Sequence, residues 1–211
     1  MIKVEKYIVN PLQENTWLLY DETRECIIID AGFYYRDEKE EILSVISENH
    51  LVPVKLVNTH CHFDHMLGVE FMRSHYKIPF LVHKDDLFWV EKAVEQGEMF
   101  GFNMKPVSPP EGYIPAGEPV RFGNSELQVL HVPGHSPGHV VFYAPEEKFI
   151  IAGDVLFYGS IGRTDLPGGD YSTLINGIRS VLFELPDETV VYCGHGQETT
   201  IGFEKMNNPF L

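Results

Sequence analysis

Hydrophobic and polar positions follow two different periods along the chain, and this pattern predicts strands interleaved with helices. Three short runs near the start are β-branched or aromatic and end at polar turns: Ile2 to Val9, Thr16 to Tyr20 and Cys26 to Asp30. The connections between these runs are short. We therefore predict an N-terminal meander of three strands.

Helical spacing appears after this meander. Apolar residues recur at helical spacing from Asp37 to His50, and Val54 to Val57 then reads as a strand. We predict two further helices, at Phe63 to Tyr76 and at Lys84 to Phe100, on either side of a strand at Phe80 to His83. Strand and helix therefore alternate as they do in βαβ units.

The stretch Gly101 to Gly117 is rich in proline and glycine, which predicts a long surface loop rather than a domain boundary. The elements expected beyond it are four strands and one helix, at Glu126 to Val132, Val140 to Ala144, Phe149 to Ala152, Tyr171 to Phe183 (the helix) and Thr189 to Tyr192. The two halves share an order of elements, without a repeat in sequence. We predict one α/β domain over residues 1–211, a length that can bury a large core.

Composition narrows the choice of partners. The 31 acidic residues outnumber the 16 basic ones and give a net charge of −15, which argues against nucleic acid and anionic membranes as partners. No window approaches the ~20 apolar residues of a membrane span, and no basic, apolar leader opens the chain. The three cysteines are scattered, which favours reduced thiols over disulfides or a structural zinc site. We expect a cytoplasmic protein.

One short segment, Thr-His-Cys-His-Phe-Asp-His, is unusually dense in possible metal ligands. His60 and His62 are two residues apart, so an extended chain directs both imidazoles to one side and Cys61 to the other. Asp64 and His65 open the predicted next helix and face the same cavity. This motif alone could therefore serve two metal ions.

Three more candidates, His135, Asp154 and His195, each follow a hydrophobic run in a glycine-marked turn. Alone, such a histidine is more often a packed residue, Asp64 would more often cap a helix, and Asp154 could simply shape a turn. The carboxylate of Asp154 has two oxygens, so it could bridge two metals about 3.5–4 Å apart. The combined imidazole and carboxylate set favours zinc over magnesium or calcium, and leaves iron and manganese open.

These motifs, with Pro-Gly-His, Gly-Asp and Gly-His-Gly following the first, resemble those of the metallo-β-lactamase superfamily over essentially the whole chain. The resemblance implies a four-layer αβ/βα sandwich with a metal site at one edge of two facing sheets. It also implies one metal on His60, His62 and His135, a second on Asp64, His65 and His195, and Asp154 as the bridge.

A narrower resemblance, to the glyoxalase II-like hydroxyacylglutathione hydrolases, is carried by Gly153 to Phe157, Gly162 to Asp165 and Gly194 to Thr200. It implies hydrolysis of a small-molecule thioester of the S-acylglutathione type by a hydroxide held between two metals, with Asp64 orienting that hydroxide. That branch grips glutathione with a C-terminal helical extension and with a lysine and a tyrosine. Here only sixteen residues follow His195, and Arg163 stands without the tyrosine, as in a compact form of the branch.

Two other functions remain open. Persulfide dioxygenases resemble this chain, share Gly-Arg-Thr-Asp, and hold one iron with the equivalents of His60, His135 and Asp154. A non-catalytic metal-binding module on the same scaffold is the other alternative. The acyl group, the thiol and the oligomeric state do not follow from the sequence.

Four residues near the motifs each have two interpretations. His139 is either a hydrogen-bond partner of the site or a buried structural histidine, and Asp30 either orients a ligand or caps a turn. Ser136 is expected to support its turn rather than to act as a nucleophile. Arg163 either meets a substrate carboxylate or pairs with a nearby aspartate.

Overall fold

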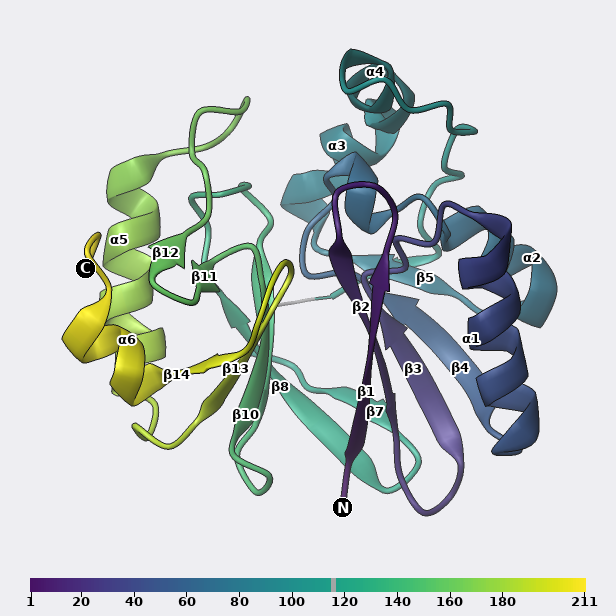
Figure 1. Ribbon diagram of the computed structural model, residues 1–211, viewed down its shortest axis with the longest axis horizontal. Coiled ribbons are helices and arrows are strands. Elements are labelled where there is room, and N and C mark those ends of the chain that lie inside the picture. The colour runs from purple at the N-terminus through teal and green to yellow at the C-terminus, as the bar shows by residue number, and fades with distance from the viewer. Residues whose placement is uncertain (115–116) are drawn as a thin grey trace.

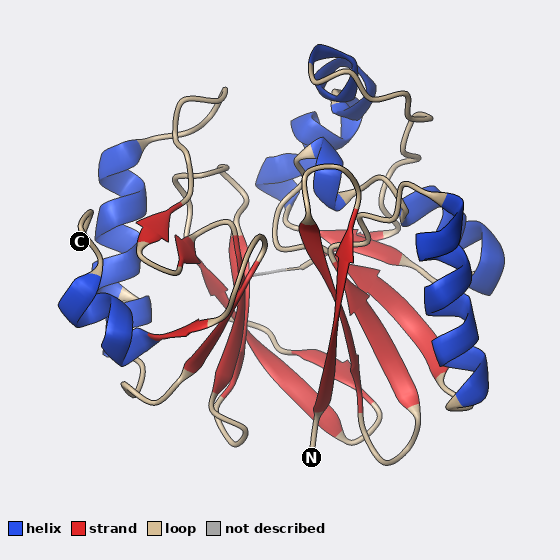
Figure 2. Cartoon of the chain, viewed as in Figure 1, coloured by secondary structure: helices blue, strands red, loops and turns tan. Residues whose placement is uncertain are grey.

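The computed structural model describes residues 1–114 and 117–211. Two six-stranded sheets face each other, and helices cover the outer face of each (Figures 1 and 2). The helices α1 (Arg36–Glu48) and α2 (Val69–Tyr76) lie on the N-terminal sheet, and α5 (Tyr171–Ser180) and α6 (Ile201–Asn207) on the C-terminal one. The predicted αβ/βα sandwich is confirmed.

The N-terminal sheet has the strand order β1-β2-β3-β4-β5-β6. Its first three strands are antiparallel, whereas β3 to β6 are parallel, because helical segments return the chain between them: α1, then α2, and last the segment between β5 and β6. The strands are β1 (Lys3–Val9), β2 (Glu14–Tyr20), β3 (Glu25–Ile29), β4 (Val52–Val57), β5 (Phe80–Val82) and β6 (Gly112–Tyr113).

The C-terminal sheet has the order β14-β13-β10-β9-β8-β7 and is antiparallel except between β10 and β13, where α5 makes the crossover. A separate hairpin, β11–β12, follows β10. The strands are β7 (Val120–Phe122), β8 (Ser125–His131), β9 (Val140–Ala144), β10 (Phe149–Gly153), β11 (Leu156–Phe157), β12 (Ser160–Ile161), β13 (Val190–Cys193) and β14 (Thr199–Thr200).

The core lies in three layers because both faces of the central strands are buried. Along β2, Trp17 and Leu19 face the opposite sheet, whereas Leu18 faces the helices α1 and α2. The period of two along a strand produces this division. Because both faces of these strands are buried, their sequences are continuous apolar runs rather than alternating ones.

The predicted strands are confirmed to within two residues at each end. The predicted helix from Tyr171 to Phe183 is too long, because α5 ends at Ser180 and a separate 3-10 turn, η3 (Leu182–Glu184), follows it. Two other predicted helices are wrong in their continuity. The first opens as a 3-10 turn, η1 (Phe63–His65), and α2 begins only at Val69. The break occurs because Gly68 packs against Phe33 and its amide donates to the Ala31 carbonyl at 2.8 Å.

The second predicted helix consists of three pieces: a 3-10 turn η2 (Lys84–Asp86), then α3 (Leu87–Glu91) and α4 (Ala93–Met99), which meet at Lys92. The predicted loop from Gly101 to Gly117 contains β6, and residues 115–116 within it lie outside the described residues. Among the described helices, none combines the length and the apolar character that a membrane crossing requires.

Candidate metal centre

The predicted ligand segments converge at one edge of the facing sheets, each just beyond the end of a strand. His60 and His62 follow β4, His135 follows β8, Asp154 follows β10 and His195 follows β13. The short turns after these strands present the side chains toward one another. The structure therefore brings together all seven predicted residues from four separate segments.

The first group consists of His60, His62 and His135, all of them buried. Their ligating atoms lie within 4.8 Å of one another, and the two Nε2 atoms of His60 and His135 are 3.2 Å apart. The ring planes of His60 and His62 are perpendicular. Three imidazoles in this arrangement could hold one metal ion.

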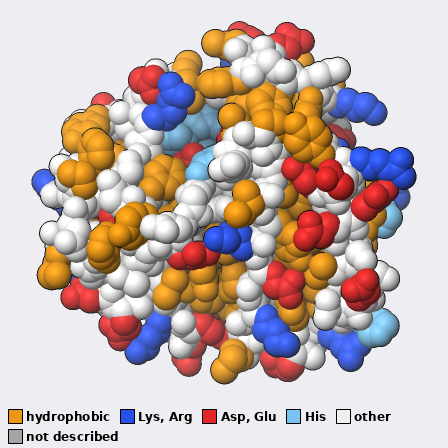
Figure 3. Space-filling model, in the orientation of Figure 1, with side chains coloured by type: hydrophobic (Ala, Val, Ile, Leu, Met, Phe, Trp, Pro, Cys, Tyr) orange, Lys and Arg blue, Asp and Glu red, His pale blue; other side chains and the backbone are white. Residues whose placement is uncertain are grey.

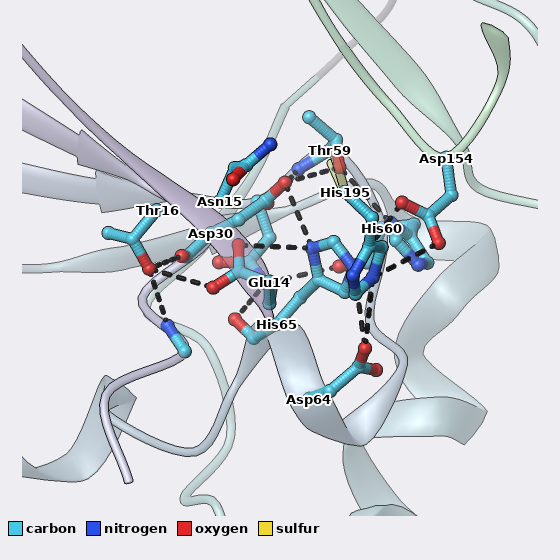
Figure 4. Close-up of polar contacts among 12 residues, drawn as sticks. Glu14, Asn15, Thr16, Asp30, Thr59, His60, Asp64, His65, Asp154 and His195 are labelled. Atoms are coloured by element: carbon cyan, nitrogen blue, oxygen red, sulfur yellow. Dashed lines mark hydrogen bonds and ion pairs between the residues drawn. The ribbon is translucent and has the colours of Figure 1, made fainter. Parts of the chain in front are cut away.

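The second group consists of Asp64, His65 and His195 (Figure 4). Asp64 Oδ2 lies 3.3 Å from His195 Nε2 and 3.8 Å from His65 Nε2. Asp154 lies between the groups: its Oδ1 is 3.5 Å from His65 Nε2, and its Oδ2 is 3.6 Å from His135 Nε2. Asp154 therefore occupies the position that a bridging carboxylate requires.

The tautomers of three histidines are fixed by their surroundings. In His60, His135 and His195 the Nδ1–H faces an oxygen acceptor, so each Nε2 lone pair points into the centre. The acceptors are Thr59 Oγ1 at 3.1 Å, the Arg163 carbonyl at 2.7 Å and the Leu12 carbonyl at 3.1 Å. Oxygen partners of this kind are typical around histidines that bind metals.

Several buried polar atoms of the centre have no hydrogen-bond partner among the described residues. They include Nε2 of His62, Nε2 of His65 and Oδ1 of Asp154. Buried polar atoms are nearly always paired, because an unpaired one retains its full desolvation cost. Divalent metal ions would satisfy these three atoms, so the residues present fit the metals that the donor set implies.

The charges of the centre are distributed between neutral and ionised groups. Burial holds the pKa of His60 well below its usual value and lowers that of His62 to about 3, so both rings are neutral and able to bind a cation. Burial alone would raise the pKa of Asp154, but His195 and His65 outweigh it and hold that pKa well below its usual value. Asp154 is therefore a carboxylate.

Asp30 and Glu14 support His65 from behind (Figure 4). Asp30 Oδ2 lies 3.2 Å from His65 Nδ1, and Asp30 also accepts hydrogen bonds from the amide and hydroxyl of Thr59, each at 2.7 Å. Of its two interpretations, Asp30 therefore fits the orienting one. Glu14, 3.5 Å from the same nitrogen, was not predicted; a carboxylate opening an apolar strand is the only signal the sequence offers.

Three neighbours of the motifs are buried beside the centre, and of its two interpretations His139 fits the hydrogen-bond partner of the site. The His139 ring accepts a hydrogen bond from the Asp154 amide at 3.1 Å and stacks on His60. The Ser136 hydroxyl donates to Asp86 at 2.8 Å, as a turn-supporting serine would. Cys61 is completely buried and belongs to none of the possible metal-ligand groups among the described residues.

Arg163 is held by a neighbour rather than free in the cavity. Its guanidinium donates two hydrogen bonds to the Asp165 carboxylate, at 2.7 and 2.8 Å. This bidentate contact matches the interpretation in which Arg163 pairs with a nearby aspartate. Through its carbonyl, which accepts from His135, the same residue also fixes a histidine of the centre.

A cavity of about 270 Å³ opens onto the centre. Figure 3 shows histidine side chains at the bottom of a hollow that hydrophobic side chains border. The walls beyond the predicted ligands are made by Leu12, Phe63, Gln96, Phe100, Arg163 and Leu166. Apart from Arg163 and Gln96 these walls are apolar, so the cavity suits a small organic molecule whose reacting group lies against the centre.

A family model described as the metallo-β-lactamase superfamily matches residues 9–195. The chain belongs to this superfamily. Hydroxyacylglutathione hydrolase GloC of Haemophilus influenzae is 38% identical to it over 100% of this chain and 98% of the relative. The chain is a metallohydrolase of the superfamily.

Two solved structures of the same fold are similar along nearly their whole lengths. BLEG-1 B3 metallo-β-lactamase is 35% identical, with a TM-score of 0.90 and coverage of 100% of this chain and 99% of that one. TTHA1623 in a di-iron-bound form is 39% identical, with a TM-score of 0.89 and coverage of 99% and 100%. The predicted family resemblance is therefore confirmed.

Proposed function

We propose that the protein is a binuclear metal-dependent thioesterase that hydrolyses S-acylglutathione-like thioesters. The position of Asp154 between the two groups of ligands carries this proposal, because a carboxylate shared by two metals is typical of binuclear hydrolytic sites. The similarity to a relative named hydroxyacylglutathione hydrolase supports the choice of thioester.

Each group would hold one metal: His60, His62 and His135 the first, and Asp64, His65 and His195 the second. Two divalent ions there would lower the pKa of a water molecule and polarise the acyl carbonyl. Zinc is the metal we propose, since imidazole and carboxylate ligands suit it. The di-iron-bound relative makes iron the first alternative, and manganese is the second.

The chain's own groups would orient the reactants. Asp64 lines the cavity and would accept a hydrogen bond from the attacking water. Leu12, Phe63 and Phe100 would exclude bulk water from the acyl group. Arg163 would meet a carboxylate of the thiol portion only by releasing Asp165, so we expect glutathione to be held weakly.

The first experiment is to purify the protein without added metal, measure zinc, iron and manganese per chain, and assay hydrolysis of S-D-lactoylglutathione on the same sample. Near two metals per chain, mostly zinc, with turnover abolished in Asp64→Ala, would support the thioesterase. Glu188→Gln is the matched control, because Glu188 is exposed and its one ion pair among the described residues is with Lys148. A metal-loaded protein that turns over no thioester would contradict the proposal.

A persulfide dioxygenase is the second candidate. His60, His135 and Asp154 form a compact subset, with ligand atoms 3.2 and 3.6 Å apart, that could hold a single iron. One iron per chain with oxygen uptake on glutathione persulfide would favour it. Metal binding without turnover of any thioester, lactone, lactam, phosphodiester or persulfide would favour a non-catalytic module.

We also propose that the protein works in the cytoplasm on a small-molecule substrate. Its three cysteines are free and buried, which is typical of a reducing compartment.

A further inference from the structure

Asp86 is a completely buried carboxylate outside the seven candidate ligands. It closes the turn η2 after β5, and its two oxygens accept three hydrogen bonds. Oδ2 accepts from the Cys61 amide at 2.9 Å and from the Ser136 hydroxyl at 2.8 Å, and Oδ1 accepts from the Gly138 amide at 2.6 Å.

The three donors belong to the two segments that carry the first group of histidines. Cys61 lies between His60 and His62, on the N-terminal half of the sandwich. Ser136 directly follows His135, and Gly138 is two residues further along the same turn, on the C-terminal half. One carboxylate therefore joins the backbone of the first segment to the turn that presents the third histidine.

Two neighbouring residues allow Asp86 to contact the turn after β8. A Cβ atom at position 138 would come within 2.8 Å of the Asp86 carboxyl carbon, so only glycine lets the turn approach so closely. His131 fixes the same turn from outside, because its Nε2 lies 2.8 Å from the Pro137 carbonyl.

The polar side-chain contacts of Asp86 in the described part of the chain are these three hydrogen bonds, and none comes from a lysine or an arginine. Three neutral donors hold its carboxylate, and burial raises the pKa of its carboxyl group. A buried carboxylate of this kind is costly, so it contributes little to stability compared with an apolar residue. What it provides is a fixed distance between two segments.

We propose that Asp86 is a positioning residue for the metal centre, which sets the spacing of His60 and His62 against His135. The inference rests on the metal site of the proposed function, but it does not depend on the substrate. Without Asp86 the turn after β8 loses the hydrogen bonds that this carboxylate makes to both segments, and the three imidazoles are held less firmly around one ion.

The test measures metal affinity rather than turnover. Metal-free wild type, Asp86→Asn, Asp86→Ala and Ser136→Ala are titrated with Zn²⁺ against a chromophoric chelator, and the absorption spectrum of each Co²⁺-loaded protein is recorded. We expect Asp86→Ala to weaken zinc binding about 10- to 100-fold. Asp86→Asn and Ser136→Ala should weaken it less, since each keeps part of the hydrogen bonding, and the cobalt spectrum should change in the same order.

Asp21→Asn is the matched control, because Asp21 is another buried carboxylate that accepts hydrogen bonds only from neutral donors, at the opposite end of the sheets. It should lower the melting temperature without changing the zinc affinity or the cobalt spectrum. Should Asp86→Ala fail to fold, the other two variants decide. Wild-type zinc affinity in folded Asp86→Asn and Ser136→Ala would overturn the proposal.

The outcomes also separate this inference from the proposed function. If the wild type binds zinc but hydrolyses no thioester, and the Asp86 variants bind zinc more weakly, the positioning role stands while the thioesterase falls. If the wild type binds neither zinc nor cobalt, both proposals fall.

Discussion

Glu14 Oε1 lies 3.5 Å from His65 Nδ1, and both side chains are completely buried. The other oxygen of Glu14 accepts a hydrogen bond from the Thr16 hydroxyl at 2.8 Å, which fixes the carboxylate in place. The approach requires glycine at position 32, since a Cβ atom there would overlap the same oxygen. Glu14 therefore faces the side of His65 that is turned away from the candidate metals.

This contact predicts that Glu14→Gln weakens the second metal more than the first. The substitution replaces the carboxyl oxygen that faces His65 Nδ1 with one end of an amide, so the ring is held less firmly and becomes a poorer ligand, while Asp30 remains. We expect zinc affinity at the second position to fall about 10-fold. Metal content after graded dialysis against a chelator measures it, with Glu188→Gln as the control. Equal retention of both metals would refute the role of Glu14.

The position of Asp154 predicts a different pattern of metal loss. Asp154→Ala removes an anion from both groups, so we expect both metals to bind more weakly and hydrolysis to fall about 100-fold. His195→Ala touches only the second group and should leave one metal per chain. Metal stoichiometry of the two variants at matched free zinc distinguishes these cases. One metal retained in Asp154→Ala would show that Asp154 serves a single ion.

The candidate ligands could be predicted from sequence because the residues around each one form a recognisable local pattern. His135, Asp154 and His195 each follow an apolar run and stand in a glycine-marked turn, and strand ends meet at one edge of a sheet. The sequence around Asp86 and Glu14 shows no such pattern of an apolar run followed by a glycine-marked turn. The hydrogen-bond partners of Asp86 lie 25 to 52 residues away in sequence, so only the closed tertiary structure makes them its neighbours.

The errors in secondary structure have a similar origin. Apolar spacing continues through Gly68 and Lys92, so the sequence pattern does not reveal that the helices break there. The short strands β6, β7 and β14 were not predicted, because each is an edge strand of two or three residues. Pairing with a neighbour, rather than local composition, makes such segments extended.

The apolar wall of the cavity predicts a preference among acyl groups. Phe100 stacks on Phe63 with ring centroids 5.3 Å apart, and both rings line the cavity. Phe100→Ala should lower kcat/KM about 3- to 10-fold for thioesters with aromatic or long aliphatic acyl groups, and little for acetyl. Met99→Ala is the control, because Met99 is 78% exposed and does not line the cavity. An equal loss for all acyl groups would mean that Phe100 does not select the substrate.

The three cysteines should be unreactive until the protein unfolds. Burial raises the pKa of Cys26 to about 12 and, with Asp154 adding to it, that of Cys193 to about 12, so neither forms a thiolate at pH 8. Burial also raises the pKa of Cys61. An aromatic disulfide reagent at pH 8 should detect no thiol in the native protein and three in guanidinium. Rapid reaction of one thiol in the native state would contradict the buried packing.

Asp21 predicts how stability depends on pH. It joins the turn after β2 to the turn after β7, accepting from the Thr23 amide at 2.9 Å, the Asn124 amide at 2.7 Å and the Ser125 hydroxyl at 2.9 Å. Burial alone would raise the pKa of Asp21, but these hydrogen bonds outweigh it and lower that pKa.

A lowered folded-state pKa means that the ionised carboxylate stabilises the fold above its unfolded pKa of about 3.9, and that this contribution disappears as the pH falls through the folded value. Asp21→Asn should therefore be about 1–3 kcal/mol less stable than wild type at pH 7. The difference should shrink below about pH 4, because protonation removes the same charge from the wild type. Urea unfolding of the metal-free proteins at pH 7 and at pH 3 measures both quantities. A difference that stays constant between the two pH values would show that the charge of Asp21 does not stabilise the fold.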